Sequence, residues 1–166
     1  MIKKTQRGFT LLLAVLISSI LIALGSAIFD IVSKQIILSS AGRESQFAFF
    51  AADTGVECAL YWDRKHDAFS TTSPLTQVSC GGDTGAAPYG GILTRVYDPN
   101  PPDAPGHPRL TTTFSFTFDG LVTNPCTDVR VTRNYLPTTT TIESYGHDTC
   151  VLSSPLRLER AIRVSY

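Results

Sequence analysis

The chain lacks several features that would point to a common function. Its 14 basic and 14 acidic side chains cancel, so no excess charge favours nucleic acid or an anionic membrane surface as a partner. It contains no H-E-x-x-H, C-x-x-C or G-x-S-x-G sequence and no glycine-rich phosphate loop. Its three histidines, His66, His107 and His147, lie far apart along the chain. We therefore expect no zinc centre, no cofactor, no nucleic-acid contact and no enzymatic activity.

A calcium site in the stretch 98–103 is the one metal alternative. Asp98, Asn100 and Asp103 offer oxygen ligands there. Three prolines among these six residues favour a rigid turn instead, and the spacing does not match an EF-hand. The sequence favours a turn without a metal.

Proline is absent before Pro74, and charge is absent from a long N-terminal run. Residues 9–29 contain no charge and no proline, and 13 of these 21 residues are Leu, Ile, Val or Phe. At roughly −0.3 to −0.6 kcal/mol for each, their insertion into a bilayer is favourable by on the order of 6 kcal/mol. As a helix they would rise about 32 Å, which matches a bilayer core of about 30 Å. The sequence predicts a transmembrane helix over residues 9–30.

The charges around this run predict its orientation. Lys3, Lys4 and Arg7 precede it, and no acidic residue occurs before Asp30. Basic residues stay on the cytoplasmic side of a membrane. We expect a single-pass protein of the cytoplasmic membrane with its N-terminus inside and the rest of the chain exported.

Export places the cysteines where disulfides persist. The four cysteines are Cys58, Cys80, Cys126 and Cys150. Four cysteines allow three pairings. We favour pairing the first with the second and the third with the fourth, because each bond closes a loop of about 25 residues and contributes on the order of 3 kcal/mol. His147, near the last cysteine, is expected to be a surface residue.

The junction between the basic segment and the apolar run resembles a known processing signal. Lys3-Lys4-Thr5-Gln6-Arg7-Gly8 followed by Phe9-Thr10-Leu11 is similar to the class III signal of type IV prepilins and pseudopilins. In that family a membrane peptidase cuts after the glycine and methylates the new N-terminal phenylalanine. The resemblance implies a leader at residues 1–8, cleavage between Gly8 and Phe9, and N-methylation of Phe9. A plain signal anchor remains the alternative.

Leu13 departs from the pattern of the family. Its members usually carry a glutamate at this fifth mature position, and that carboxylate pairs with the N-terminus of a neighbouring subunit. A carboxylate in lipid is costly and persists only with a partner or a task. With leucine at this position, the chain resembles a minor pilin or the glutamate-lacking tip pseudopilin rather than the major subunit. The alternative is that Leu13 is a lipid-facing leucine of a membrane anchor.

Residues 31–62 are predicted to continue the helix as an amphipathic segment. One apolar stripe of this segment comprises Phe47, Phe50, Ala51, Thr54, Cys58 and Tyr61. The opposite stripe comprises Phe49, Ala52, Val56 and Leu60. Two stripes indicate one face for a head domain and one for a neighbouring helix, or a helix buried deeply within one domain. Residues 49–57 are also similar to the Phe/Tyr-x-Ala-Ala-Glu-x-Gly stretch of minor pilins of the PilX type, with Asp53 in place of glutamate.

The rest of the chain is predicted to be a small head. Residues 63–111 are rich in turn formers and hold one expected strand at 92–97, so we expect an irregular connection. Residues 112–166 are predicted to form antiparallel strands, with strict alternation at 114–118 and 129–133 and a turn at Asp119-Gly120. A shift of the alternation near Arg160-Ala161 indicates a bulge or a late strand start. We expect the stripe from Phe47 to Tyr61 to cover this sheet.

These observations predict an α+β fold of the pilin type, in which a long N-terminal helix packs on a small antiparallel sheet. The function implied by the resemblance is that of a minor subunit of a type IV pilus or pseudopilus, at the tip or in initiation. Its partners would be other pilin subunits through residues 9–50, the prepilin peptidase and an inner-membrane assembly platform. The alternative is a single-pass, membrane-anchored extracellular binding or adhesion module that does not assemble.

Overall fold

A computed structural model describes residues 7–81, 90–101, 105–118 and 124–166 of the 166-residue chain. The elements are a long helix, α1 (Arg7–His66), and the strands β1 (Thr94–Asp98), β2 (Arg109–Thr117), β3 (Cys126–Tyr135), β4 (Thr138–His147) and β5 (Glu159–Ser165). The chain divides into two compact units, Met1–Gly42 and Arg43–Tyr166. The expected α+β class, with one long helix and an antiparallel sheet, is confirmed.

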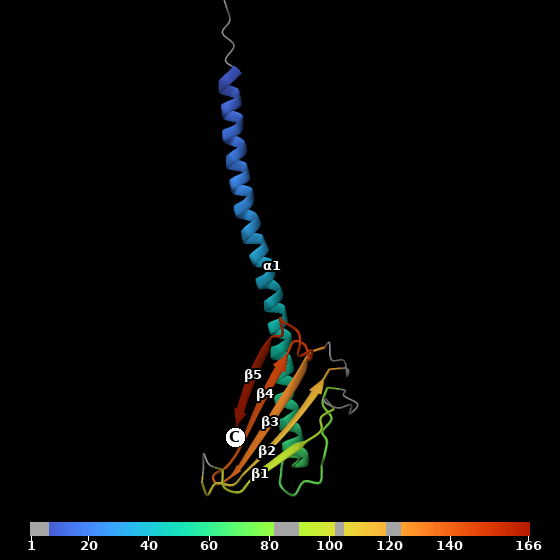
Figure 1. Ribbon diagram of the computed structural model, residues 1–166. Helices are drawn as coiled ribbons and strands as arrows, with labels where there is room; N and C mark the ends of the chain where they lie inside the picture. Colours follow the sequence, from blue (N-terminus) through green and yellow to red (C-terminus); the bar gives the residue numbers. More distant parts are fainter. Residues whose placement is uncertain (1–6, 82–89, 102–104, 119–123) are drawn as a thin grey trace, which may run out of the picture. The chain divides into compact units, whose positions relative to one another are not determined.

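The five strands form one antiparallel sheet in the order β1-β2-β3-β4-β5 (Figure 1), so each strand pairs with the next in the sequence. Such a meander needs only short connections, and β3 and β4 are joined by Leu136 and Pro137 alone. Burial alternates along β2, β3 and β4, as expected for a sheet with one covered face. The covered face is the inner face of the sheet; the opposite one is the outer face.

The second part of α1, from Arg43 onward, covers the inner face with small side chains. Its buried apolar residues are Ala48, Ala51, Ala52, Val56 and Ala59. The expectation that the stripe from Phe47 to Tyr61 covers the sheet is therefore wrong, because Phe47, Phe50 and Tyr61 are 40%, 63% and 55% exposed. Small residues face the strands because helix and sheet approach too closely for larger ones.

Two glycines mark this close approach. A Cβ on Gly146 of β4 would overlap the carbonyl oxygen of Ala48 and the amide nitrogen of Ala52. A Cβ on Gly55 of α1 would overlap the side chains of Ser144 and Thr127. The Thr127 hydroxyl also donates a hydrogen bond to the Ala51 carbonyl (2.6 Å), which joins β3 directly to the helix backbone.

Large apolar side chains fill the space beyond the end of this small-residue contact. Phe69, Phe116 and Ile142 are fully buried, and the ring of Phe69 stacks on that of Phe114 at 5.8 Å between centroids. Phe69 lies in the connection after α1, which the Cys58–Cys80 disulfide ties back to the helix. The connection predicted to be irregular thus supplies part of the core.

The strand boundaries differ from the predicted ones in detail. The strand expected at 92–97 is Thr94–Asp98, and the strand expected from residue 112 begins at Arg109. Of the two explanations for the shift near Arg160, the late start is the observed one, since β5 begins at Glu159 and pairs with β4 without interruption. The turn expected at Asp119-Gly120 lies outside the described residues.

Replacing Gly146 with alanine tests the close helix–sheet contact. We expect Gly146→Ala to lower the free energy of unfolding by about 1 to 3 kcal/mol, because the methyl group meets helix backbone rather than a side chain that can move. Chemical denaturation of the full chain in detergent, followed by circular dichroism, measures this loss.

Gly42→Ala is the matched control, because Gly42 is also within a regular element but has nothing within 4 Å of its Cβ position. It should be neutral or stabilise the helix by up to about 1 kcal/mol. Equal effects of the two substitutions would contradict the close packing of Gly146 against the backbone of α1.

Candidate functional site

The first unit of the chain presents an apolar helix surface. The charge-free segment 9–29 is helical throughout, and Phe9, Leu21 and Ile22 are 70%, 63% and 72% exposed within the unit. By length and composition this helix could span a membrane, with a mean hydropathy of 2.6 in its most apolar window. A continuous apolar surface of this size requires lipid or protein around it rather than water.

The serines of this segment do not need water as a hydrogen-bond partner. Ser18 donates to the carbonyl of Ala14 (2.8 Å), and Ser19 donates to that of Leu16 (2.8 Å). Ser26 bonds in the same way within its own helical turn, to Ala23 (2.9 Å). Polar groups that are paired inside the segment lower the cost of an apolar environment.

The predicted processing and assembly residues lie at the start of α1. Gly8 belongs to the first helical turn, where backbone N–H groups have no partner within a helix and unwinding costs least. Phe9 follows it with an exposed side chain, and Leu13 is 46% exposed in the middle of the apolar surface. Lys3 and Lys4, the other half of the predicted signal, lie outside the described residues.

The outward side of α1 in the second unit carries aromatic residues that are not buried against the sheet. Phe47, Phe49 and Phe50 are 40%, 49% and 63% exposed. Phe47 and Phe50, together with Phe118 and Pro125, surround an open depression of about 160 Å³. Aromatic side chains gathered in this way are typical of a surface that contacts another molecule.

The end of α1 is anchored by an ionic network that sequence reasoning missed. Asp63, with a 5% exposed side chain, accepts hydrogen bonds from Arg133 of β3 (2.6 Å) and from the Tyr166 hydroxyl (2.6 Å). Arg133 also pairs with Asp67 (2.8 Å). The available signal was the spacing of Asp63 behind Ala52, Val56 and Ala59, which puts it on the buried side of the helix. Removing Arg133 would leave the buried carboxylate of Asp63 without a cationic partner, so the network fixes this end of the helix.

Both disulfides have the pairing that the loop-length argument favours. Cys58–Cys80 and Cys126–Cys150 have Cα–Cα distances of 6.0 and 5.5 Å, and no free cysteine remains. The second bond holds the segment between β4 and β5 against β3. Asp148 and Leu158 close the base of that segment through two hydrogen bonds of 3.2 and 2.8 Å.

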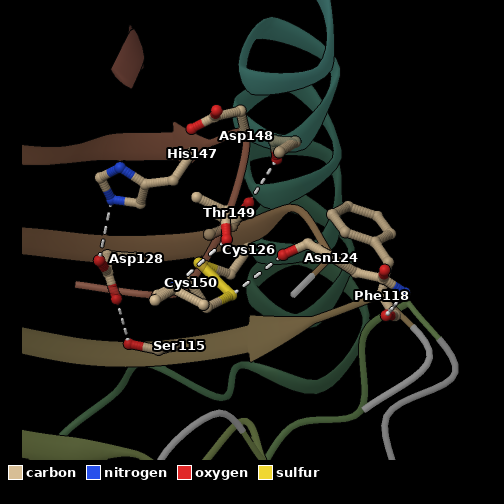
Figure 2. Close-up of a disulfide and its surroundings, with 12 residues drawn as sticks. Ser115, Phe118, Asn124, Cys126, Asp128, His147, Asp148, Thr149 and Cys150 are labelled. Atoms are coloured by element: carbon tan, nitrogen blue, oxygen red, sulfur yellow. Dashed lines mark hydrogen bonds and ion pairs between the residues drawn. A yellow bond between two sulfur atoms is a disulfide. The ribbon is translucent and has the colours of Figure 1, made fainter. Parts of the chain in front are cut away.

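His147 lies beside this disulfide, and it is buried. The expectation of a surface histidine is wrong, since only 3% of the residue is exposed. Figure 2 shows its ring in line with Asp128 and Ser115: Nε2 lies 3.2 Å from one carboxylate oxygen, and the Ser115 hydroxyl donates to the other at 2.5 Å. The carboxylate of Glu159 is 3.7 Å from Nδ1 on the opposite side of the ring.

The electrostatics of this cluster favour an ionised Asp128. The hydrogen bond from His147 lowers the pKa of the Asp128 carboxyl below its ordinary value, burial opposes this effect, and the bond from Ser115 adds to it. The order of the groups does not suit nucleophilic catalysis, because Ser115 donates to a carboxylate and not to the imidazole that would act as its base. The cluster stabilises three neighbouring strands.

The other candidate ligands are not brought together. His66 packs on Trp62 with ring centroids 4.6 Å apart, and His107 contacts the Leu136 carbonyl. Asp98 and Asn100 accept hydrogen bonds from backbone N–H groups at 3.0 and 2.7 Å, as side chains do in a tight turn. Asp103 lies outside the described residues, and the described part of the chain holds no group of three or more His, Cys, Asp or Glu suited to a metal.

Comparison of the chain with protein-family models, with curated proteins and with solved structures finds no match.

The acid stability of the head tests the role of Asp128. Because its pKa is lowered in the folded state, its ionised form stabilises the fold above the unfolded pKa of about 3.9, and this contribution disappears as the pH falls through the folded pKa. We expect Asp128→Asn to lower the free energy of unfolding near neutral pH by about 1 kcal/mol or less, since the carboxylate is half exposed. Denaturation curves should converge with those of the wild type once the pH has fallen through the lowered folded-state pKa of Asp128.

Asp53→Asn, at an exposed aspartate of α1, controls for the loss of one charge. If Asp128→Asn shifted stability by the same amount at every pH, the assigned hydrogen-bonded ion would be wrong.

Proposed function

We propose that this protein is a minor structural subunit of a type IV pilus or pseudopilus. The observation that carries the proposal is the helix α1, which runs from Arg7 to His66. Its first part, from Phe9, has a charge-free apolar surface, and its last part covers a disulfide-bonded sheet. A chain that needs only a membrane anchor does not require a helix that continues into its head. A chain that assembles into a filament through this helix requires that continuity.

The chemistry of the helix supports storage in a membrane followed by transfer to a filament. Lipid and a core of packed helices differ little in polarity, so the apolar surface around Leu13 suits both environments. Because the two environments are nearly equivalent, the transfer gains little free energy and needs an external motor. An inner-membrane assembly platform would provide it.

The exposed aromatic residues support contact with neighbouring subunits. Phe47, Phe49 and Phe50 stay outside the head although its core is made from the same helix. Packed between subunits, each such ring would contribute roughly 1.5 to 3 kcal/mol of apolar burial. The segment 9–50 would then contact neighbours along both its apolar and its aromatic parts.

The N-terminal residues support a precursor with its N-terminus in the cytoplasm and an exported head. Lys3, Lys4 and Arg7 precede the apolar run, and both disulfides lie after it. In this proposal the prepilin peptidase removes residues 1–8 and methylates Phe9. Leu13, in place of the usual glutamate, favours a position without a neighbour ahead, at the tip or at initiation.

The mature N-terminus tests the assembly hypothesis against that of a membrane-anchored binding module. Mass spectrometry of the protein purified from its own host should find an N-methylated Phe9. An intact Met1 would refute processing and would favour the hypothesis of a membrane-anchored binding module.

Substitutions of Gly8 and of Gly25 make this experiment more specific. Gly8→Val should leave the leader in place, since a bulky residue does not fit a protease site that accepts glycine. Gly25→Ala, within the same helix and with nothing within 4 Å of its Cβ position, should be processed like the wild type. Equal processing of both variants would argue against cleavage after Gly8.

The position of Leu13 predicts low abundance. Quantitative mass spectrometry of purified filaments should find this chain at a small fraction of the dominant subunit. If this chain were itself the dominant subunit, the inference from Leu13 to a minor role would fail, although assembly would stand.

A further inference from the structure

The outer face of the sheet has a composition unlike the rest of the head. An open depression of about 610 Å³ lies on it. Three arginines, one glutamate and a group of threonines line it, among them Arg109, Arg130, Arg163 and Glu143. In volume it falls within the range of small-molecule sites. Among the described residues, none that lines it belongs to α1.

Strand register places these side chains in rows across the sheet. One row pairs Thr113 with Arg130, Arg130 with Glu143, and Glu143 with Arg163. In the next row hydroxyl side chains follow one another: Thr111, Thr132, Thr141 and Ser165 are successive partners. Neighbouring strands lie about 4.8 Å apart, so these groups form a closely spaced polar surface.

Arg130 is the exposed cation at the centre of this surface. In the described part of the chain its guanidinium makes no hydrogen bond or ion pair, whereas Nε of Arg163 lies 3.7 Å from a carboxylate oxygen of Glu143. Asp128, the acidic residue two positions earlier on the same face, is occupied by Ser115 and His147. The planar guanidinium of Arg130 is therefore available for an external carboxylate, which it can bind through two parallel hydrogen bonds.

The groups around Arg130 indicate which anion fits. Hydroxyls of Thr111, Thr113, Thr132 and Thr141 both donate and accept hydrogen bonds, as the hydroxyls of a sugar require. A nucleic acid fits poorly. Among the described residues no aromatic ring lines the depression for base stacking, and Glu143 lies between two of the arginines. A protein partner also fits poorly, because Val96 is the one apolar residue among the described residues of the lining.

We infer that the outer face of the sheet binds an acidic saccharide, whose carboxylate contacts Arg130 and whose hydroxyls contact the surrounding threonines. The inference goes beyond filament assembly and depends on the head alone, so it holds for an assembled or an unassembled chain. Affinity is expected to be modest, with Kd about 1 mM or tighter, since the depression is open and shallow polar sites leave water in place.

Isothermal titration of the full chain in detergent with a trisaccharide of galacturonic acid tests the inference. The acidic trisaccharide should bind, and maltotriose, which is neutral, should bind at least about tenfold more weakly. Arg130→Gln should weaken binding of the acidic sugar by about tenfold or more. Arg43→Gln, at an exposed arginine of α1, is the matched control and should leave binding unchanged.

Glu143→Gln should increase the affinity for the acidic sugar, which a misfolded variant would not do. Removing this carboxylate beside Arg130 lowers repulsion of the ligand, so binding should tighten about twofold to threefold. Equal binding by Arg130→Gln and wild type, or equal affinity for maltotriose, would overturn the inference. Tighter binding of a single-stranded DNA oligonucleotide that is lost in Arg130→Gln would overturn the assignment to a saccharide.

Discussion

The close contact between α1 and β4 is the constraint on which the rest of the head depends. Gly146 lies directly against the backbone of the helix at Ala48 and Ala52, and Gly55 lies against Ser144 and Thr127. At this separation only small side chains fit between helix and sheet. Every larger apolar residue of the helix must lie either beyond the contact, in the core around Phe69, or on the outward side.

This division gives the head two different surfaces. The outward side of the helix keeps Phe47, Phe49 and Phe50, whose apolar rings are partly exposed. The outer face of the sheet keeps threonines and arginines, which can stay in water or bind a polar ligand. The proposals of assembly and of saccharide binding therefore concern opposite layers of the fold and do not compete for the same residues.

Polar groups inside the head connect elements that are far apart in the sequence. Asp63 reaches Arg133 and the C-terminal Tyr166, and His147 reaches Asp128. A buried charge is tolerated because its partner is close, and each pair in turn fixes the position of a strand. Together with the two disulfides, these pairs hold a small sheet whose core is limited in size.

Local pattern was sufficient to predict the helix, the strands and the disulfides, because each depends on neighbours along the chain. Residues 9–29 read as an apolar helix without further information, and alternation in residues 114–118 and 129–133 read as strands. Short loops favoured the observed cysteine pairs. The resemblance of Gly8-Phe9 to a prepilin processing signal also rests on the sequence alone, since such a signal consists of consecutive residues.

Only the tertiary structure decided which side of the helix covers the sheet. Hydrophobicity favoured the stripe with Phe47 and Phe50, yet the distance between α1 and β4 admits only the small residues between Ala48 and Ala59. The burial of His147 and the partners of Asp63 could not be predicted from the sequence either. Each depends on residues more than eighteen positions away in the chain. Periodicity along one chain predicts that a face is apolar; how closely two elements approach is set by both of them together.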